Sequence, residues 1–492
     1  DPSVLKPFSN EALLHLPPLL AKESVDDVKV NPDLVESQKV EIRRILGNYQ
    51  DVLTDLPGKT SLGVHEIKLT DNEPVRRRPY PIPHALRTKM KEEVQNMLDM
   101  GVIEKSNSPY ASPLVIVKKA DGSDRYCVDM RLVNQKTIFD AEPIPDQEEI
   151  FAKLARDHYF TKIDLSKGYW QIPMAKDSKP ITSFVTHDGT YQFIMMPFGL
   201  VNAAATFSRI MRILLRGIPN VDNYIDDILI HTQSWEEHLC RLKEVFSRLR
   251  KANLSARPTK CCIGFEQVEF LGHVVGHGCV MPKSDKVESI QNAKRPLTKK
   301  QLRSFLGLIG FYRKYIPNFA AIASPLTDRT RKGLPNIVEW GESHEKSFQT
   351  LKAKLAQSPI LHLPVLSQQF ILRTDASDTG VGAVLLQDFD GVKFPIAFAS
   401  KKLTRCQVKY SVIERECLAV IWAVQKFEPF LYGREFVLET DHQPLSCIQK
   451  SRVANGRIMR WALALQPFRF RVVAIKGRDN VGADYMSRSI SN

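Results

Sequence analysis

The spacing of hydrophobic residues predicts two helices in the first part of the chain. Between residues 35 and 53, and again between residues 84 and 100, apolar side chains recur at helical intervals. The first stripe contains Ile42, Ile45, Leu46, Tyr49 and Leu53, and the second contains Leu86, Met90, Val94, Met97 and Leu98. Gly101 follows the second stripe, so we expect that helix to end there.

Short apolar runs bounded by turn residues predict strands further along the chain. These runs are residues 113–117, 125–128, 159–165 and 224–230. Asp121-Gly122 predicts a hairpin turn between the first two, and the last run reads as two short strands that meet at Asp226-Asp227. Residues 280–365 are mostly of helical pattern, and strands and helices alternate after Phe370. The pattern predicts an α+β body, a helical segment and a compact α/β C-terminal domain.

The composition is that of a folded protein. The 492 residues suffice for roughly three domains. A hydrophobic content of 43% with 25% charged residues excludes wholesale disorder. No apolar run approaches the roughly 18 residues that cross a bilayer, and no signal peptide is visible. Because the chain starts at Asp1 rather than Met, we expect it to be a fragment of a longer protein.

The charge and the cysteines indicate which partners and which cellular compartment suit this protein. The net charge of +14 is spread along the chain, as suits a protein that follows a phosphate backbone, although a basic protein without such a partner fits equally. The eight cysteines form no Cys-x-x-Cys pair, which argues against a zinc ribbon. Reduced thiols in a reducing compartment are the simplest interpretation.

The first candidate site is a set of aspartates at predicted strand ends. Asp226 and Asp227 lie between apolar strand residues, and Asp164 also follows a strand. A Tyr-x-Asp-Asp run alone arises by chance in roughly 5% of chains of this length, and a solvated turn explains it as well. Three carboxylates together would hold two Mg²⁺ ions for phosphoryl transfer, with Lys118, Lys119 and Arg125 as candidate triphosphate ligands.

Several motifs in one order resemble a known family. They are Arg125-Tyr-Cys-Val-Asp129-x-Arg131-x-x-Asn134, Asp164-Leu-x-x-Gly-Tyr169, Met196-Pro-Phe-Gly-Leu-x-Asn-Ala203, Tyr224-Ile-Asp-Asp227 and Phe270-Leu-Gly-His273. Together they resemble the reverse transcriptases of gypsy-type LTR retrotransposons (metaviruses), relatives of the retroviral enzymes. The resemblance implies an α+β right-hand polymerase of fingers, palm and thumb that copies RNA and DNA into DNA.

The resemblance also implies roles for single residues in polymerisation. Asp164 and Asp226 would bind both metals, with Asp227 assisting. Arg125 and Lys118, rather than the adjacent Lys119, would bind the triphosphate. Tyr169 matches the steric gate against ribonucleotides, although a core aromatic is the alternative.

Further matches concern the nucleotide pocket and the nucleic acid. Phe198 and Gly199 would line the nucleotide pocket. Phe270, Leu271, Gly272 and His273 match the primer grip. Arg131 and Asn134 would contact template backbone, unless they have structural polar roles.

A second set of acidic residues follows Phe370. Asp375 and Asp441 end predicted strands, Glu416 lies on a predicted helix, and Asp484 lies in the closing segment. The expected buried face of that helix consists of Ile413, Cys417, Val420, Val424 and Phe427. Four such carboxylates would make another two-metal site that activates water against a phosphodiester. Their order and contexts resemble RNase H, which implies an α/β RNase H-like domain.

Neighbouring residues leave alternatives within this second set. Glu414 competes with Glu416 as a ligand, but Ser411-x-x-Glu414 reads as a capping box, so Glu416 is preferred. Asp378 is expected to serve a turn. Ile475 stands where many RNases H have a loop histidine, so we expect slower RNA cleavage.

These observations give four expected segments and one leading function. The segments are an N-terminal extension with the start of the fingers (1–75), fingers and palm (76–275), thumb or short connection (276–365) and RNase H (366–492). Residues 1–55 are either a polyprotein linker or a folded support for the fingers. The leading function is an RNA- and DNA-dependent DNA polymerase with RNase H activity that converts retroelement RNA into double-stranded DNA. The alternatives are a non-catalytic nucleic-acid-binding protein and a host-type polymerase without RNase H.

The family resemblance extends to cofactors, partners and location. It implies two Mg²⁺ per site, with Mn²⁺ as an alternative ion. The expected partners are an RNA template, a DNA primer/template, an RNA–DNA hybrid, a tRNA primer and dNTPs, with no membrane and a monomeric or homodimeric protein. The expected location is the cytoplasm, within virus-like particles.

Overall fold

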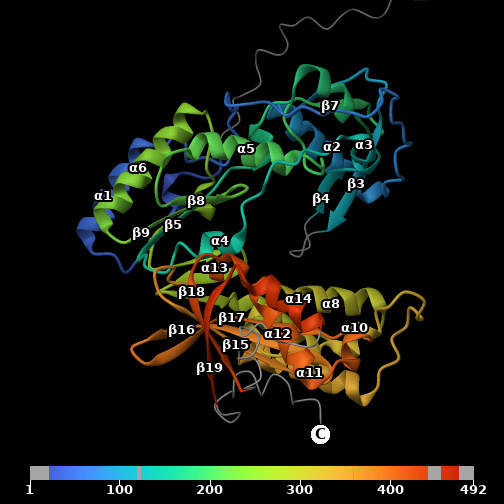
Figure 1. Cartoon of the computed structure of the whole chain (residues 1–492). Helices are drawn as coiled ribbons and strands as arrows, with labels where there is room; N and C mark the ends of the chain where they lie inside the picture. Colours follow the sequence, from blue (N-terminus) through green and yellow to red (C-terminus); the bar gives the residue numbers. More distant parts are fainter. Residues whose placement is uncertain (1–20, 119–123, 358–359, 442–455, 476–492) are drawn as a thin grey trace, which may run out of the picture. The chain divides into compact units, whose positions relative to one another are not determined.

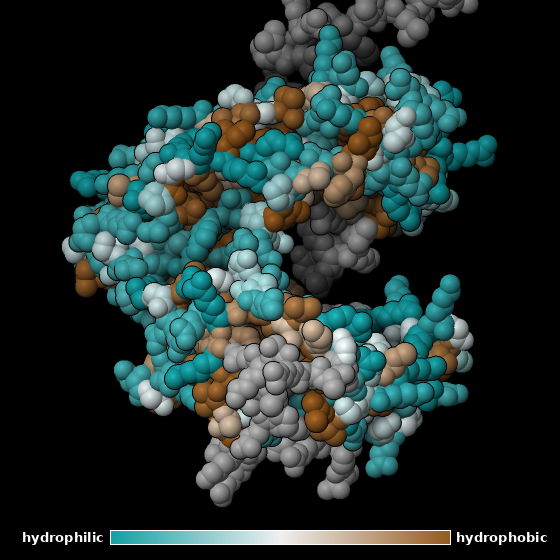
Figure 2. All heavy atoms as spheres, viewed as in Figure 1, coloured by the Kyte–Doolittle hydropathy of each residue, from teal (hydrophilic) through white to brown (hydrophobic). Residues whose placement is uncertain are grey.

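The computed structural model of the chain (Figure 1) describes residues 21–118, 124–357, 360–441 and 456–475. The chain divides into two compact units. The first combines Asp1–Gln147 with His158–Val268, and the second combines Glu148–Asp157 with Glu269–Asn492. Within the described residues, no helix has both the length and the apolar character that a membrane crossing requires. Hydrophilic residues cover most of the face seen in Figure 2, and hydrophobic residues form small groups on it.

A five-stranded sheet in the order β1-β10-β5-β9-β8 forms one half of the first unit. Its strands are β1 (Lys29–Val30), β5 (Tyr159–Asp164), β8 (Val221–Tyr224), β9 (Asp227–Thr232) and β10 (Cys262–Phe265). Helices α1 (Glu36–Asn48), α5 (Ala203–Leu215) and α6 (Trp235–Lys251) belong to the same half. Their apolar faces share one core with the sheet, in which Ile228, Ile230 and Leu242 are fully buried.

The other half of the first unit contains a second five-stranded sheet, in the order β2-β7-β6-β3-β4. Its strands are β2 (Ile103–Lys105), β3 (Ser112–Lys118), β4 (Asp124–Val128), β6 (Phe184–Val185) and β7 (Thr190–Phe193). The helices here are α2 (His84–Asp99) and α3 (Arg131–Lys136). As predicted, Met90, Val94 and Met97 are buried, and the chain leaves α2 through Gly101 at φ +64°.

The second unit begins with a small sheet and a helical stretch. The sheet is β11 (Gln267–Phe270), β12 (His273–Gly276), β13 (Cys279–Pro282) and β14 (Leu361–His362). The helices are α4 (Gln147–Phe151), α7 (Ser284–Gln291), α8 (Lys299–Phe311), α9 (Phe319–Ile322), α10 (Ser324–Asp328) and α11 (Glu342–Ala356). The mostly helical character predicted for residues 280–365 is confirmed.

The rest of the second unit is an α/β domain, as predicted. Its sheet order is β17-β16-β15-β18-β19. The strands are β15 (Phe370–Ala376), β16 (Gly380–Phe389), β17 (Val392–Lys402), β18 (Glu435–Thr440) and β19 (Arg469–Ala474). Strands β15 to β17 are antiparallel, whereas β18 lies parallel to both β15 and β19. Helices α12 (Val412–Lys426), α13 (Glu428–Leu431) and α14 (Gly456–Leu465) supply apolar residues to the core against this sheet.

Two sequence predictions about helices are wrong in detail. The first helix ends at Asn48, and Leu53 instead forms a β-bridge with Ala256, because the chain turns after Tyr49 to reach the sheet. Ile413, predicted on the buried face of α12, is 44% exposed. It lies in the first turn of α12, whereas the buried stripe includes Cys417, Val420 and Val424.

Candidate active sites

Three carboxylates meet in the first sheet, as the sequence predicts. Asp164 is the last residue of β5 and lies opposite Asp227, the first residue of β9. Asp226 lies in the tight turn between β8 and β9, next to Ile225 at φ +54°. The turn after β5 also approaches Asp226, since a Cβ on Gly168 would lie 3.4 Å from the Asp226 Oδ2 atom. A Cβ at this position would make ordinary van der Waals contact with the Asp226 side chain.

Two lysines compensate part of this negative charge. The Lys260 ammonium lies 3.0 and 3.1 Å from the two Asp164 carboxylate oxygens, and the Lys162 ammonium lies 3.2 Å from Asp227. Burial and the carboxylates of Asp227 and Asp164 raise the pKa of Asp226. Burial also raises the pKa of Asp227, against the opposing effect of Lys162. Sequence reasoning missed Lys260, whose only local signal is its place just before β10, the strand beside β5.

The donor set of this cluster fits a hard divalent cation. It consists of carboxylate oxygens, which Mg²⁺ and Mn²⁺ prefer. Burial, and then the negative charge of the neighbouring carboxylates, raise the pKa of Asp226. Among the described residues, no three acidic, histidine or cysteine side chains are arranged to hold one ion. Asp164 and Asp227 point to their lysine partners instead.

The aromatic residues predicted for the nucleotide pocket lie together. Tyr169, on the 3₁₀ turn Gly168–Gln171, packs against Phe198 and Phe207 with ring centroids 5.2 and 5.6 Å apart. Burial, and then Asp226, raise the pKa of the Tyr169 hydroxyl. Gly199 has φ +92°, a conformation that suits glycine.

Lys118 and Arg125 lie in β3 and β4, where Lys118 pairs with Asp124 and Arg125 pairs with Val117. This pairing places both residues beside the hairpin turn. Their side chains, and all of Lys119, are outside the described part of the chain.

The residues proposed to contact the template make defined intramolecular contacts. The Asn134 side-chain amide donates to the Gly199 carbonyl oxygen at 2.8 Å and accepts from the Val201 N–H at 2.9 Å. Arg131 forms a bidentate ion pair with Asp129, both N–O distances being 2.7 Å. Asn134 therefore has the structural role that was the alternative to template contact, since it supports the loop that follows Phe198. The exposed Arg131 guanidinium is held in place by Asp129.

The predicted primer-grip residues form a tight turn in the second unit. Phe270 is fully buried, and Leu271 and Gly272 both have positive φ angles, +49° and +78°. The Tyr312 hydroxyl donates to the Gly272 carbonyl oxygen at 2.9 Å. His273 is buried in a group of aromatic rings, namely Phe151, Phe311, Tyr312 and Tyr315. Burial, and then Lys314, lower its pKa to about 4, so His273 is neutral at pH 7.

The second acidic set is brought together on the α/β domain. Asp375 is near the end of β15, Asp441 follows β18, which pairs with β15, and α12 carries Glu416. Asp484 lies outside the described residues. Ile475 follows β19 and donates its N–H to the Thr440 carbonyl oxygen at 2.9 Å.

The alternatives to Glu416 have other partners. Glu414 completes the capping box with Ser411 and accepts from Arg457 at 2.8 Å. Asp378 is exposed and forms an ion pair with Arg415. Both side chains are therefore engaged in helix and turn contacts.

Glu416 itself has the environment of a metal ligand. It is 6% exposed, and its Oε2 atom has no hydrogen-bond partner within the described structure. Burial, and then the carboxylates of Asp375 and Asp441, raise its pKa to about 8. A buried carboxylate with an unused oxygen beside two more carboxylates fits a divalent cation.

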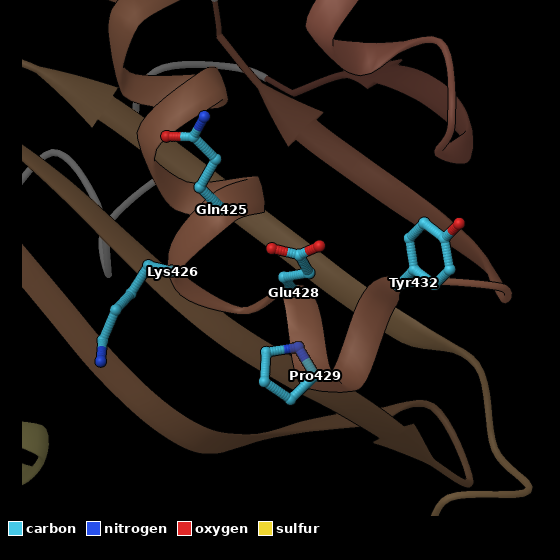
Figure 3. Close-up of a pocket in the computed structure, with 5 residues that line it drawn as sticks. All are labelled: Gln425, Lys426, Glu428, Pro429 and Tyr432. Atoms are coloured by element: carbon cyan, nitrogen blue, oxygen red, sulfur yellow. The ribbon is translucent and has the colours of Figure 1, made fainter.

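A surface pocket of about 620 Å³ lies elsewhere on this domain (Figure 3). It is lined by Gln425, Lys426, Glu428, Pro429 and Tyr432 from the end of α12 and from α13. None of the predicted site residues lines it. Gln425 is about 13 Å further along the axis of α12 than Glu416, at about 1.5 Å per residue.

Two parts of the chain match known family models. Residues 117–275 match the reverse transcriptase (RNA-dependent DNA polymerase) model. Residues 365–468 match the model of the RNase H-like domain found in reverse transcriptase. Each match contains an acidic set described above, except that Asp484 lies beyond the second match.

Curated relatives extend this similarity over most of the chain. The Pol polyprotein from transposon 297 of Drosophila melanogaster is 40% identical over 431 residues, which are 86% of this chain and 40% of the relative. The Pol polyprotein from transposon gypsy of the same organism is 36% identical over 491 residues, 95% of this chain and 47% of the relative. The chain thus spans less than half the length of these two relatives.

Solved structures with the same fold include the foamy viral protease-reverse transcriptase. Its dRH form in complex with double-stranded DNA has a TM-score of 0.84 at 24% identity, covering 94% of this chain and 84% of that chain. Its complex with an RNA/DNA hybrid has a TM-score of 0.80 at 24% identity, covering 94% and 64%. The fold prediction, an α+β right-hand polymerase followed by an α/β RNase H-like domain, is confirmed. The chain belongs to the gypsy-type LTR retrotransposon reverse transcriptases with RNase H, which are relatives of the retroviral enzymes.

Proposed function

We propose that the chain synthesises DNA on RNA and DNA templates and degrades the RNA strand of RNA–DNA hybrids. The observation that carries this proposal is the pair of acidic sets, one in each matched domain, with carboxylates at adjoining strand ends in both. Each set contains a carboxyl group whose pKa is raised by burial and by neighbouring carboxylates, Asp226 in the first and Glu416 in the second, as expected of residues that hold cations during phosphoryl transfer.

In the polymerase site, Asp164 and Asp226 would hold the metal ions, with Asp227 in support. Two Mg²⁺ ions would supply Lewis-acid stabilisation of the attacking 3′-hydroxyl and the leaving pyrophosphate. The Tyr169 ring, which packs against Phe198 and Phe207, would limit the space next to the sugar of the nucleotide. Arg125 and Lys118 would neutralise the triphosphate from the β3–β4 hairpin.

In the RNase H site, Asp375, Glu416, Asp441 and Asp484 would form the metal set. Bound cations would supply an activated water for attack on the RNA phosphodiester. Glu416 would lose its proton on binding a cation, because the added positive charge offsets the burial and the neighbouring carboxylates that raise its pKa. With Ile475 in place of a loop histidine, we expect this cleavage to be slow.

The proposed partners follow from the charge and the relatives. The net charge of +14 suits a nucleic acid backbone, and the related foamy viral protein was solved with duplex DNA and with an RNA/DNA hybrid. We infer that this chain binds the same classes of nucleic acid, with dNTPs as substrates and a tRNA as primer. We also infer a monomer or homodimer that works inside cytoplasmic virus-like particles.

The test is primer extension on an RNA template with dNTPs and Mg²⁺, with different labels on the two strands. We expect the DNA primer to lengthen while the RNA shortens. Extension with intact RNA would contradict the proposed cleavage. Neither product, from folded protein that still binds the hybrid, would favour a non-catalytic binding protein.

A further inference from the structure

The segment Lys22–Asn31 precedes the residues matched to the polymerase, yet it carries β1 (Lys29–Val30), an edge strand of the first sheet. Strand β1 within it lies parallel to β10 at the sheet edge. The Lys29 N–H donates to the Cys261 carbonyl oxygen at 3.1 Å, and the Asn31 N–H donates to that of Ile263 at 3.0 Å. The Asn31 side-chain amide, which is buried, donates to the Gly264 carbonyl oxygen at 3.0 Å. Strand β1 and Asn31 therefore attach this segment to the edge of the sheet that contains Asp164.

Glu23 in this segment holds the turn that precedes β10. Its carboxylate accepts two hydrogen bonds from the Arg257 guanidinium, at 2.7 and 2.8 Å. It also accepts from the Thr259 hydroxyl at 2.8 Å and from the Thr259 N–H at 3.2 Å. The Glu23 side chain is only 13% exposed. Charge-assisted bonds of this kind are stronger than neutral ones, so Glu23 fixes both ends of a short loop.

The same turn reaches the polymerase carboxylates. The Arg257 N–H donates to the Asp164 carbonyl oxygen at 2.8 Å. The 3₁₀ turn Pro258–Lys260 then ends in Lys260, whose ammonium contacts both carboxylate oxygens of Asp164. Glu23 and Asp164 are thus joined through one four-residue turn, with Glu23 on one side of it and the carboxylate on the other.

We propose that Glu23 is a positioning residue of the polymerase site, which acts through the turn 257–260 to hold Lys260 against Asp164. The inference rests on the proposed function of that site. It assigns the N-terminal segment to the catalytic sheet, rather than to a linker or to a support of the fingers. A displaced Lys260 would no longer hold both carboxylate oxygens of Asp164 in place before the cations bind. A misplacement of a catalytic group by about 1 Å can cost about a hundredfold in rate.

The first test compares Glu23→Ala with Glu36→Ala, which removes an exposed ion pair with Arg43 on α1. Single-turnover dNTP incorporation on an RNA template gives the maximal rate and the apparent dNTP affinity. We expect Glu23→Ala to lower the maximal rate about tenfold or more, with dNTP affinity and RNA cleavage near wild type. Glu36→Ala should match wild type. Equal behaviour of the two variants, with an active wild type, would overturn the inference, whereas an inactive wild type would instead refute the proposed function.

The second test asks whether Glu23 acts through Lys260. Non-additivity in a double-mutant cycle reports coupling between two residues. In a Lys260→Gln background, we expect Glu23→Ala to cause little further loss of rate. Multiplied losses would show that Glu23 acts independently and would overturn the inference. If Glu23→Ala unfolds the first unit, Glu23→Gln takes its place, since it keeps an acceptor oxygen for Thr259 and removes the charge facing Arg257.

A third readout does not depend on activity. Hydrogen exchange of the backbone amides in 257–263 should be faster in Glu23→Ala than in wild type, because the turn loses its anchor. Glu36→Ala should leave this exchange unchanged. Unchanged exchange in Glu23→Ala would mean that Glu23 does not hold the turn.

Discussion

Glu416 has an environment that decides its protonation. Its carboxyl group is buried on α12, close to the carboxylates of Asp375 and Asp441. Glu414, two residues away, instead points to Ser411 and Arg457. The same residue type therefore serves as a helix cap at one position and as a candidate metal ligand at the other, because burial and neighbours differ.

The raised pKa of Glu416 predicts a pH-dependent stability of the metal-free protein. The folded protein retains this proton up to about pH 8, whereas the unfolded chain releases it near 4.5, so stability falls as the pH rises between these values. Glu416→Gln should remove up to about 4 kcal/mol of this loss at pH 8 or above. Calorimetry in EDTA from pH 5 to 9 measures it, with the exposed Glu435→Gln as control. Identical pH profiles for wild type and Glu416→Gln would contradict the prediction.

The position of Tyr169 leads us to expect that its ring excludes ribonucleotides during polymerisation. Its ring is fixed by Phe198 and Phe207, so truncation should open space that a ribose 2′-hydroxyl can enter. We expect Tyr169→Ala to improve ribonucleotide incorporation relative to deoxynucleotide by about tenfold or more, measured as the ratio of kcat/KM values. Tyr169→Phe, which keeps the ring, serves as control. Unchanged discrimination in Tyr169→Ala would exclude Tyr169 as the gate.

At the level of elements, short local devices deliver the carboxylates. The β8–β9 turn presents Asp226 beside Asp227, and the pairing of β5 with β9 adds Asp164. In the α/β domain, the capping box of α12 fixes the start of the helix that carries Glu416. The turn and the cap are readable from a few adjacent residues, since they depend on local hydrogen bonds. The pairing of β5 with β9 is not, because it joins distant parts of the chain.

Removal of Ser411, the N-cap of α12, should destabilise the second unit alone. Ser411→Ala deletes the oxygen that accepts from the Glu414 N–H, which should destabilise the second unit by about 1 kcal/mol. Ser234→Ala removes the equivalent cap of α6 and should affect the first unit. Because the two units have separate hydrophobic cores, we expect calorimetry of the whole chain to show a separate unfolding transition for each. A shift of the same transition by both variants would contradict this assignment.

For the whole molecule, the two acidic sets lie in different compact units. Asp164, Asp226 and Asp227 belong to the first, and Asp375, Glu416 and Asp441 to the second. Each unit has a hydrophobic core of its own. The two activities should therefore be separable by mutation.

This separation gives a paired prediction. Asp226→Asn should abolish DNA synthesis, with at least a hundredfold loss, and spare RNA cleavage, whereas Asp441→Asn should do the reverse. The dual-label primer-extension assay measures both in one reaction. Loss of both activities in either variant, with unfolding seen by calorimetry, would contradict the assignment of separate sites.

Local patterns in the amino-acid sequence are sufficient to predict several helices, one hairpin and the family. Apolar spacing predicts α2 and most of α1, the turn residues predict the β8–β9 hairpin, and the order of motifs indicates the family. These features depend on neighbours within a few residues, so the residue order alone specifies them. The same limit explains the two errors. Leu53 is buried as part of a β-bridge rather than a helix, because the chain turns toward the sheet, and Ile413 is exposed because packing, rather than the helical period, decides which side chains are covered.

Contacts between distant residues arise only from packing in three dimensions. No local pattern joins Lys260 to Asp164 or Glu23 to Arg257, because both pairs depend on β10 lying between β1 and β5. The raised pKa of Glu416 likewise requires three chain segments to be buried together. Strand order and burial are collective outcomes of the whole core, which is why charge pairing in both sites could not be predicted from the amino-acid order.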